Sequence, residues 1–281
     1  MSKLADVISE SRPDKNWDEE TLAQQREIEQ EVAKSQPFVG KKQSLEALEA
    51  EYNEKESGEF LHKAKELRVR YPQWRRVRGD GNCFYRAVAF AQLERFLRRD
   101  HPTWKEDFEK FRDLATKWKQ RLLAMGYPPM TTEDFCDVFH DIIKKLEQED
   151  ANEEKLLSIF NTQAESEYIV VFMRLITGGY LLENEATYGG FVDGDRSMKQ
   201  FVEQEVNPMY RECDHLCIIA LAQALNIPIR IEYMDRSQAP AGGWHHDFTV
   251  NDLQKPGIFF LYRPGHYDIL YPKEEDVSAC S

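Results

Sequence analysis

Apolar residues recur at helical spacing between Phe135 and Leu146. They occupy positions i, i+3, i+4, i+7, i+8 and i+11 of this stretch, so one face of a helix would be hydrophobic and the other polar. The preceding residues 131–134, Thr-Thr-Glu-Asp, have the spacing of a capping box, with Asp in place of the usual Glu. The pattern predicts an amphipathic helix that starts at this box.

Two further stretches are apolar on nearly every side, which is typical of buried helices. Residues 168–176 read YIVVFMRLI, and residues 216–225 read LCIIALAQAL. Because glycine is frequent just past a helix C-terminus, we expect the pair Gly178–Gly179 to end the first of these helices.

The last part of the chain has the patterns of strands. Apolar and polar side chains alternate through residues 227–233, as in a half-buried strand. Residues 258–262 and 266–271 are rich in aromatic and branched residues and flank Pro264-Gly265, which predicts an antiparallel hairpin. The segment 234–248 is expected to be a loop.

Segment 67–78 contains five arginines and no acidic residue. Pro72 prevents one uninterrupted helix, so we expect a helix end, a turn and a short extended piece that leads to Asp80. With helices in the first two-thirds of the chain and strands near its end, the sequence predicts an α+β fold in which a small, mostly antiparallel sheet is packed between helices.

The N-terminal region is polar. Residues 1–16 are expected to be a disordered tail, and residues 17–66 a helical arm. Within the arm, residues 18–34 favour helix by propensity. The apolar stripe of that helix consists only of Leu22, Ile28 and Val32. Two interpretations remain open: a solvated surface helix, or an arm that docks a partner through the stripe.

Composition narrows the function classes. The net formal charge is −13, from 37 basic and 50 acidic residues, which argues against nucleic-acid binding because phosphate contacts use Lys and Arg.

No apolar run approaches the roughly 20 residues that span a bilayer, and the first 17 residues lack the apolar core of a signal peptide. Five cysteines without framework spacing indicate a reducing compartment. We therefore expect a cytoplasmic protein, with a nuclear pool as an open alternative, and no membrane partner.

The segment 78–87, RGDGNCFYRA, places a thiol between a turn and a predicted helix. At a helix start, the sulfur of Cys83 would lie near the positive end of the helix dipole and near unpaired N–H groups, and both favour a thiolate. Backbone N–H groups of the turn 80–82 could hold the oxyanion that forms when a thiolate attacks a carbonyl. The alternative is a structural cysteine behind a surface turn.

His266 and Asp268 offer a base and an orienting acid for such a nucleophile. At i and i+2 of the predicted strand they project from the same face. Asp268 could accept the proton-bearing nitrogen of His266 and leave the other nitrogen to face the thiol. The alternatives are a satisfied or solvated strand histidine and an acid at a turn end.

Other candidate sites are weaker. Cys213, His215 and Cys217 carry metal-type donors, but on a helix residue 215 would point away from the other two, so no zinc site is predicted. His245–His246 lies in the expected loop and would be solvated. We expect neither a metal nor a cofactor.

Two motifs together carry a family resemblance. They are DGNCFYRA at residues 80–87 and YRPGHYDILY at residues 262–271. Both resemble the otubains, a branch of the ovarian-tumour (OTU) cysteine deubiquitinases, and the likeness extends from about Leu22 to Tyr271. It implies an OTU papain-like cysteine protease fold, with residues 67–271 as the catalytic domain and residues 272–281 as a C-terminal tail.

The resemblance also implies residue roles. Cys83 would be the nucleophile, and His266 the general base and then acid, with its imidazole oriented by Asp268. The oxyanion hole would consist of the backbone N–H groups of Asp80, Gly81 and Cys83. Asp80, the aspartate of the motif, is often assigned to the active site, and we interpret its part as shaping the loop.

The activity implied by the resemblance is hydrolysis of isopeptide bonds that join ubiquitin to lysine, with a preference for the linkage that marks proteins for the proteasome. Otubains also bind ubiquitin-charged conjugating enzymes and block ubiquitin transfer without catalysis. In otubains the N-terminal helix helps to hold a ubiquitin, which would give a use to Leu22, Ile28 and Val32. Expected partners are ubiquitin, polyubiquitin chains and conjugating enzymes. One alternative is mainly a binding inhibitor with secondary hydrolysis, and another is a redox-sensing thiol protein.

Overall fold

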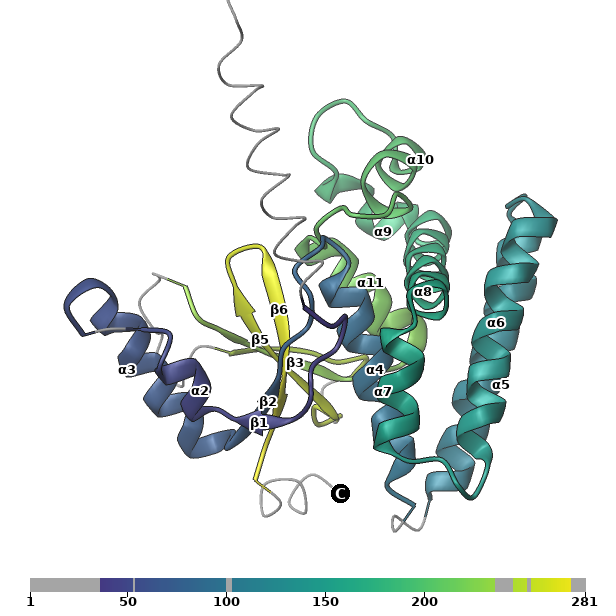
Figure 1. Ribbon diagram of the computed structural model, residues 1–281. Helices are drawn as coiled ribbons and strands as arrows, with labels where there is room; N and C mark the ends of the chain where they lie inside the picture. The colour runs from purple at the N-terminus through teal and green to yellow at the C-terminus, as the bar shows by residue number, and fades with distance from the viewer. Residues whose placement is uncertain (1–35, 53, 100–102, 236–244, 252–253, 274–281) are drawn as a thin grey trace, which may run out of the picture. The chain divides into compact units, whose positions relative to one another are not determined.

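A six-stranded sheet runs through the unit formed by residues 37–281, in the order β1-β2-β6-β5-β3-β4 (Figure 1). Neighbouring strands are antiparallel except β3 and β5, which are parallel, so the predicted mostly antiparallel sheet is confirmed. The computed structural model describes residues 36–52, 54–99, 103–235, 245–251 and 254–273. The strands are β1 Gln43–Ser44, β2 Gln73–Arg75, β3 Ile229–Tyr233, β4 His245–Phe248, β5 Ile258–Arg263 and β6 His266–Tyr271.

Helices lie on both sides of the sheet, with α2 and α3 on one side and α4 and the remaining helices on the other (Figure 1). Short 3₁₀ and π turns, Gly189–Phe191 and Val202–Val206, join the later helices. The α-helices are α2 Glu46–Glu49, α3 Glu54–Arg70, α4 Cys83–Leu97, α5 Trp104–Ala124, α6 Pro129–Glu147, α7 Glu153–Asn161, α8 Gln163–Glu183, α9 Glu185–Tyr188, α10 Met198–Phe201 and α11 His215–Leu225. No helix in the described ranges is long and apolar enough to cross a membrane.

Strand β6 contributes to two hydrophobic cores through its alternating side chains. Tyr267 and Ile269 belong to the large core that α4 and its neighbours cover. Leu270 belongs to a smaller core with residues of α2 and α3. Because side chains alternate along a strand, His266 and Asp268 are on the same face as Leu270, toward α2 and α3.

The predicted boundary between the arm (17–66) and the catalytic domain (67–271) falls inside α3, and the compact unit begins at Pro37. Leu48 of α2 and Ala64 of α3 are fully buried in the smaller core. This part of the predicted arm therefore belongs to the same unit as the catalytic candidates. Residues 1–35, with the predicted helix 18–34, lie outside the described part of the chain.

Gly178 and Gly179 lie inside α8, so the helix end predicted at this pair is wrong. A Cβ atom on Gly178 would lie 2.7 Å from Oδ1 of Asn207, and one on Gly179 would lie 2.9 Å from Cδ2 of Leu122. The two glycines therefore allow α8 to pack closely against its neighbours.

Two further predictions need correction. Helix α6 begins at Pro129, before the predicted box at 131–134, and its N-cap residue makes no side-chain cap; proline suits the first turn because it has no N–H to leave unpaired. The predicted loop 234–248 contains β4, which pairs with β3. Asp247 of β4 binds Arg230 of β3 through two hydrogen bonds of 2.7 and 2.8 Å. The amphipathic helix, the buried helix α11 and the β5–β6 hairpin are confirmed.

Candidate active site

Cys83 is the first residue of α4, directly behind the turn 79–82, as the sequence predicts. Gly81 in this turn has a φ of +72°, a conformation that glycine adopts without steric penalty. Cys83 is buried, with 5% of the residue exposed. The sulfur therefore lies buried at the N-terminus of α4, where the positive end of the helix dipole acts on it.

His266 and Asp268 lie together on β6. Nε2 of His266 is 2.8 Å from Oδ1 of Asp268, and the same oxygen accepts the backbone N–H of Val77 at 2.9 Å. Asp268 is fully buried. Since an ionised carboxylate can only accept hydrogen bonds, Nε2 carries a proton and Nδ1 is left for another partner.

Nδ1 of His266 faces the turn 79–82. A Cβ atom on Gly79 would lie 3.3 Å from it, and no described side chain makes a hydrogen bond of standard geometry with it. The Cys83 thiol lies beside the imidazole without a hydrogen bond of standard geometry, and this contact contributes to the raised pKa of His266. Such contacts are often loose before substrate binds.

The pKa of His266 is strongly raised. Burial lowers this pKa, but the charge of Asp268, the hydrogen bond to it and the contact with Cys83 outweigh burial and raise the pKa to about 10. The imidazole is therefore protonated at neutral pH, and an imidazolium stabilises a thiolate beside it.

Arg263, the last residue of β5, binds the second oxygen of Asp268. Its Nη2 donates to Oδ2 at 2.7 Å, and its Nη1 donates to Oε2 of Glu51 at 2.9 Å. Burial would raise the pKa of Asp268, but the nearby charges of His266 and Arg263 and the Val77 N–H lower it overall. The carboxylate therefore stays ionised although it is buried.

Asp80 organises the turn in front of Cys83. Its Oδ1 accepts the backbone N–H of Asn82 at 3.0 Å and Nη1 of Arg86 at 2.9 Å. Arg86 is itself buried and binds Oγ of Ser166. The Asp80 carboxylate is thus engaged by the loop and α4, in keeping with a loop-shaping part, whereas Asp268 is the carboxylate that contacts the imidazole.

Arg174 of α8 also binds the turn 79–82. Its Nη2 donates to the carbonyl of Gly81 at 2.8 Å and to Oδ1 of Asn82 at 2.9 Å, and also reaches the carbonyl of Arg211. Asn82 accepts the backbone N–H of Tyr210 as well. A Cβ atom on Gly81 would lie 2.6 Å from the Tyr210 carbonyl, so the turn 79–82 and the segment 207–211 pack backbone to backbone.

The three predicted oxyanion donors are not equivalent. The backbone N–H of Asp80 donates to the Arg78 carbonyl at 3.1 Å, so it is engaged within the turn in this structure. The N–H groups of Gly81 and Cys83 make no hydrogen bond with described residues. Of the three predicted donors, these two are therefore the ones without a partner among the described residues.

Arg263, Glu51 and Arg174 are site residues that were not predicted from the sequence. The sequence does contain a signal for Arg174, because it is the single arginine in the apolar run 168–176. The predicted ubiquitin contacts Leu22, Ile28 and Val32 lie outside the described residues. In the part of the chain that the structure describes, no three His, Cys, Asp or Glu side chains are grouped so that they could hold a metal ion.

Comparison with known proteins gives consistent matches. The family described as Peptidase C65 Otubain matches residues 31–272. Ubiquitin thioesterase OTUB1 of Homo sapiens is 40% identical over 255 residues, which covers 91% of this chain and 90% of the relative. Ubiquitin thioesterase otubain-like of Caenorhabditis elegans is 39% identical over 260 residues, covering 92% and 90%. The solved complex "h/ceOTUB1-ubiquitin aldehyde-UBCH5B~Ub" contains a chain that is similar with a TM-score of 0.83 and 41% identity, covering 92% of this chain and 99% of that one.

Proposed function

Because this chain belongs to the otubain family of peptidases, we propose that it is a cysteine-type deubiquitinase that hydrolyses bonds to the C-terminus of ubiquitin, with Cys83 as its nucleophile. The observation that carries the proposal is the meeting of Cys83 with His266, whose imidazole is held by Asp268 at 2.8 Å. These residues are brought together from α4 and from the last strand of the sheet.

In the proposed reaction, the Cys83 thiolate attacks the carbonyl carbon of the scissile bond. The N–H groups of Gly81 and Cys83 donate to the oxygen that becomes negative. Nδ1 of the protonated His266 then gives its proton to the departing amine nitrogen, which leaves a thioester on Cys83. The neutral imidazole next takes a proton from water while the oxygen of that water attacks the thioester carbonyl. The C–S bond then breaks, which releases the Cys83 thiolate and the carboxylic acid, and the acid loses its proton to solvent. Asp268 keeps the proton on Nε2 throughout.

The substrate class rests on the relatives. Those named above are ubiquitin thioesterases, and the similar complex holds ubiquitin aldehyde. We propose polyubiquitin as the substrate, with a preference for the lysine linkage that marks proteins for the proteasome.

A second, non-catalytic activity is the other candidate. Two solved neighbours contain UBCH5B~Ub or UBC13~Ub, which are conjugating enzymes charged with ubiquitin. We propose that this chain also binds such charged enzymes and inhibits ubiquitin transfer, with Leu22, Ile28 and Val32 as contacts for ubiquitin. In the alternative function, the chain is mainly a binding inhibitor of ubiquitin transfer and its hydrolysis of ubiquitin chains is secondary.

The test is a panel of di-ubiquitins of every linkage, treated with the wild type and with Cys83→Ser. Cleavage by the wild type alone, fastest for the proteasome-targeting linkage, supports the proposal. Cleavage by Cys83→Ser at the wild-type rate would show that Cys83 is not the nucleophile. In a parallel transfer assay, Cys83→Ser should still inhibit a charged conjugating enzyme, and deletion of residues 1–35 should weaken that inhibition. A redox-sensing thiol would instead oxidise readily and fail to react with an electrophilic ubiquitin probe.

We propose a cytoplasmic location, with a nuclear pool as the alternative, because five cysteines without framework spacing indicate a reducing compartment. Cell fractionation of the tagged chain tests this. Recovery in a secretory or membrane fraction would contradict it.

A further inference from the structure

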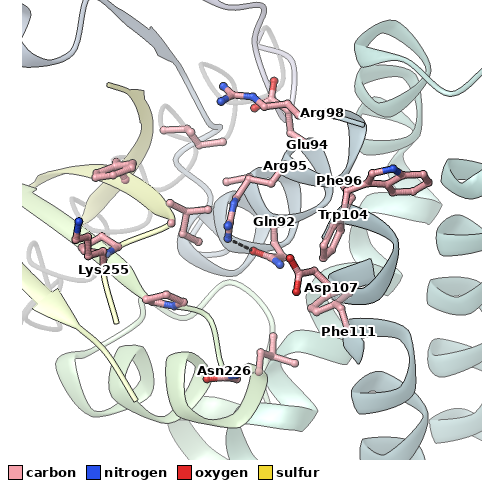
Figure 2. A pocket seen from close by; sticks show the side chains of 18 of the residues that line it. Gln92, Glu94, Arg95, Phe96, Arg98, Trp104, Asp107, Phe111, Asn226 and Lys255 are labelled. Carbon is pink, nitrogen blue, oxygen red and sulfur yellow. Dashed lines mark hydrogen bonds between the residues drawn. The ribbon is translucent and has the colours of Figure 1, made fainter. Parts of the chain in front are cut away.

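A cavity of about 670 Å³ lies at the far end of α4 from Cys83 (Figure 2). Its walls are the last turns of α4, the first turns of α5, the start of β5 and the end of β6. This size is in the range of pockets that bind ligands, roughly 300–1,000 Å³. The mechanism proposed above uses none of the residues that line it.

The cavity is positively charged on its α4 side, although the whole chain is acidic. Arg95 and Arg98 line it from successive turns. Arg98 forms no ion pair with a carboxylate of the described residues, and Arg95 makes a hydrogen bond of 3.3 Å to Gln92, a neutral partner (Figure 2).

The two acidic residues of the lining hydrogen-bond to other groups, although the charge of Asp107 still acts on Arg95. Glu94 accepts from Arg75 at 2.8 Å and from the Tyr271 hydroxyl at 2.6 Å. Asp107 accepts from the hydroxyl of Thr103 at 2.8 Å. Because no carboxylate of the described residues hydrogen-bonds to Arg95 or to Arg98, the C-cap residue of α4, both guanidinium groups remain available to an anionic ligand.

The remaining lining is largely apolar. Phe96, Trp104 and Phe111 form an aromatic wall opposite the strands, and Figure 2 shows their side chains beside Arg95 and Gln92. A ligand that combines carboxylates with small apolar side chains would match both parts of the cavity.

The chain itself supplies such a segment. Tyr271 and Pro272 line the cavity, and the sequence continues after Lys273 as EEDVSACS, residues 274–281. We propose that this cavity is the docking site of residues 274–281, whose acidic side chains bind Arg95 and Arg98.

Charge and reach both support this occupant. Glu274, Glu275 and Asp276 follow one another, and the segment contains no basic residue. Carboxylate–guanidinium hydrogen bonds are among the strongest that side chains form. Because an extended residue spans at most about 3.6 Å, three residues cover roughly 10 Å, so the acidic group stays close to the cavity edge where Pro272 lies. Val277 and Ala279 then supply the apolar part.

The test uses a fluorescein-labelled peptide of residues 272–281 and fluorescence anisotropy at low salt. The peptide should bind a chain truncated after Lys273. It should bind the untruncated chain at least tenfold more weakly, because residues 274–281 of that chain would already occupy the site. Arg98→Glu in the truncated chain should weaken binding at least tenfold. The matched control is Lys117→Glu, an equal charge change at an exposed position of α5 outside the cavity, which should alter binding less than twofold.

Equal affinity for the truncated and untruncated chains would overturn the proposal, and so would equal binding by Arg98→Glu and Lys117→Glu. Hydrogen exchange gives a second measurement that needs no truncation. The amides of residues 274–281 should exchange at least tenfold faster in Arg98→Glu than in Lys117→Glu. The same rate in both variants would also overturn the proposal. Because neither measurement depends on hydrolysis, this inference and the proposed function can fail independently.

Discussion

Arg263 donates to Oδ2 of Asp268 at 2.7 Å, while Oδ1 of the same carboxylate binds Nε2 of His266 at 2.8 Å. Each oxygen thus has its own partner, and the carboxylate can neither rotate nor turn away from the imidazole without breaking a charged hydrogen bond. Arg263 is held in turn by Glu51, 212 positions earlier in the chain. Orientation of the proposed base therefore depends on the segment that follows α2.

Replacement of Arg263 by Gln should destabilise the fold and reduce turnover. It leaves a fully buried carboxylate without its second cationic partner, and breaking a buried pair costs about 3–5 kcal/mol; since His266 and the Val77 N–H remain, we expect a loss on the order of 2–4 kcal/mol. Urea unfolding at pH 7 measures this, and kcat should fall more than KM changes. Arg263→Lys should recover part of both losses.

The control for Arg263 is Arg230→Gln, which removes the pair with Asp247. Both side chains of that pair are about 30% exposed (27% and 32%), so its loss should cost less than about 1 kcal/mol. Equal destabilisation by the two substitutions would contradict the positioning role of Arg263.

Asp268→Asn should shift the alkaline limb of the pH profile of kcat/KM to lower pH. In the proposed mechanism the protonated His266 donates to the leaving amine, and this form is lost as the pH rises through its pKa of about 10. Without the Asp268 charge, burial lowers that pKa, so the active form is lost earlier. By comparison with an equivalent aspartate change in serine proteases, kcat should fall roughly 10²- to 10⁴-fold.

A fluorogenic amide of the ubiquitin C-terminus, assayed from pH 6 to above pH 10, measures both effects. Asp247→Asn, remote from His266, is the control and should leave the limb in place. If the alkaline limb of the pH profile does not shift in Asp268→Asn, a group other than His266 controls the loss of activity at high pH.

Gly79→Ala should impair catalysis with little effect on stability. The added Cβ would lie 3.3 Å from Nδ1 of His266, which is close enough to push the imidazole away from Cys83, and small displacements of reacting groups can reduce rates up to about 100-fold. The control Gly58→Ala adds a methyl group inside α3, where no atom lies within 4 Å, and should raise stability by up to about 1 kcal/mol. Wild-type kcat/KM in Gly79→Ala would contradict the placement of Nδ1.

The central geometry of the site could be predicted because it depends on local patterns. The position of Cys83 at a helix start follows from a turn that runs into apolar, helix-forming residues. The shared face of His266 and Asp268 follows from the period of two along a strand. Their meeting with Cys83 could be expected from the need of a thiolate for a base, and from the family resemblance.

The supporting contacts could not be predicted, because they are made by residues far apart in sequence with no local pattern. Nothing about Glu51 indicates that it binds Arg263. The Gly178–Gly179 pair suggested a helix end by its usual preference, but tertiary packing against Asn207 and Leu122 explains it instead. An arginine within an apolar helix shows only that some buried acceptors exist, and the structure identifies them for Arg174.

Arg174→Lys should lower kcat/KM although it keeps the positive charge. Arg174 is fully buried, and its two terminal nitrogens reach the carbonyls of Val206, Gly81 and Arg211 and Oδ1 of Asn82. A lysine ammonium has three donors at one point and cannot match the planar fork, so at least one buried acceptor loses its partner, at about 1–3 kcal/mol. We expect a stability loss of that order and a roughly tenfold lower kcat/KM, because the Gly81 and Cys83 donors would no longer be held in place.

The two effects of Arg174→Lys can be separated by assaying below the unfolding transition, where both proteins are fully folded. Hydrogen exchange should then be faster in residues 207–213 of the variant, since Arg174 joins this segment to the turn that bears Cys83. The matched control is Arg121→Lys, which changes a 41% exposed arginine that pairs with Glu183 on the surface, and it should retain wild-type kcat/KM. If Arg174→Lys lost stability but kept the wild-type rate and exchange pattern, Arg174 would support the fold alone, and the alignment of the oxyanion donors would have to come from Asp80 and Arg86.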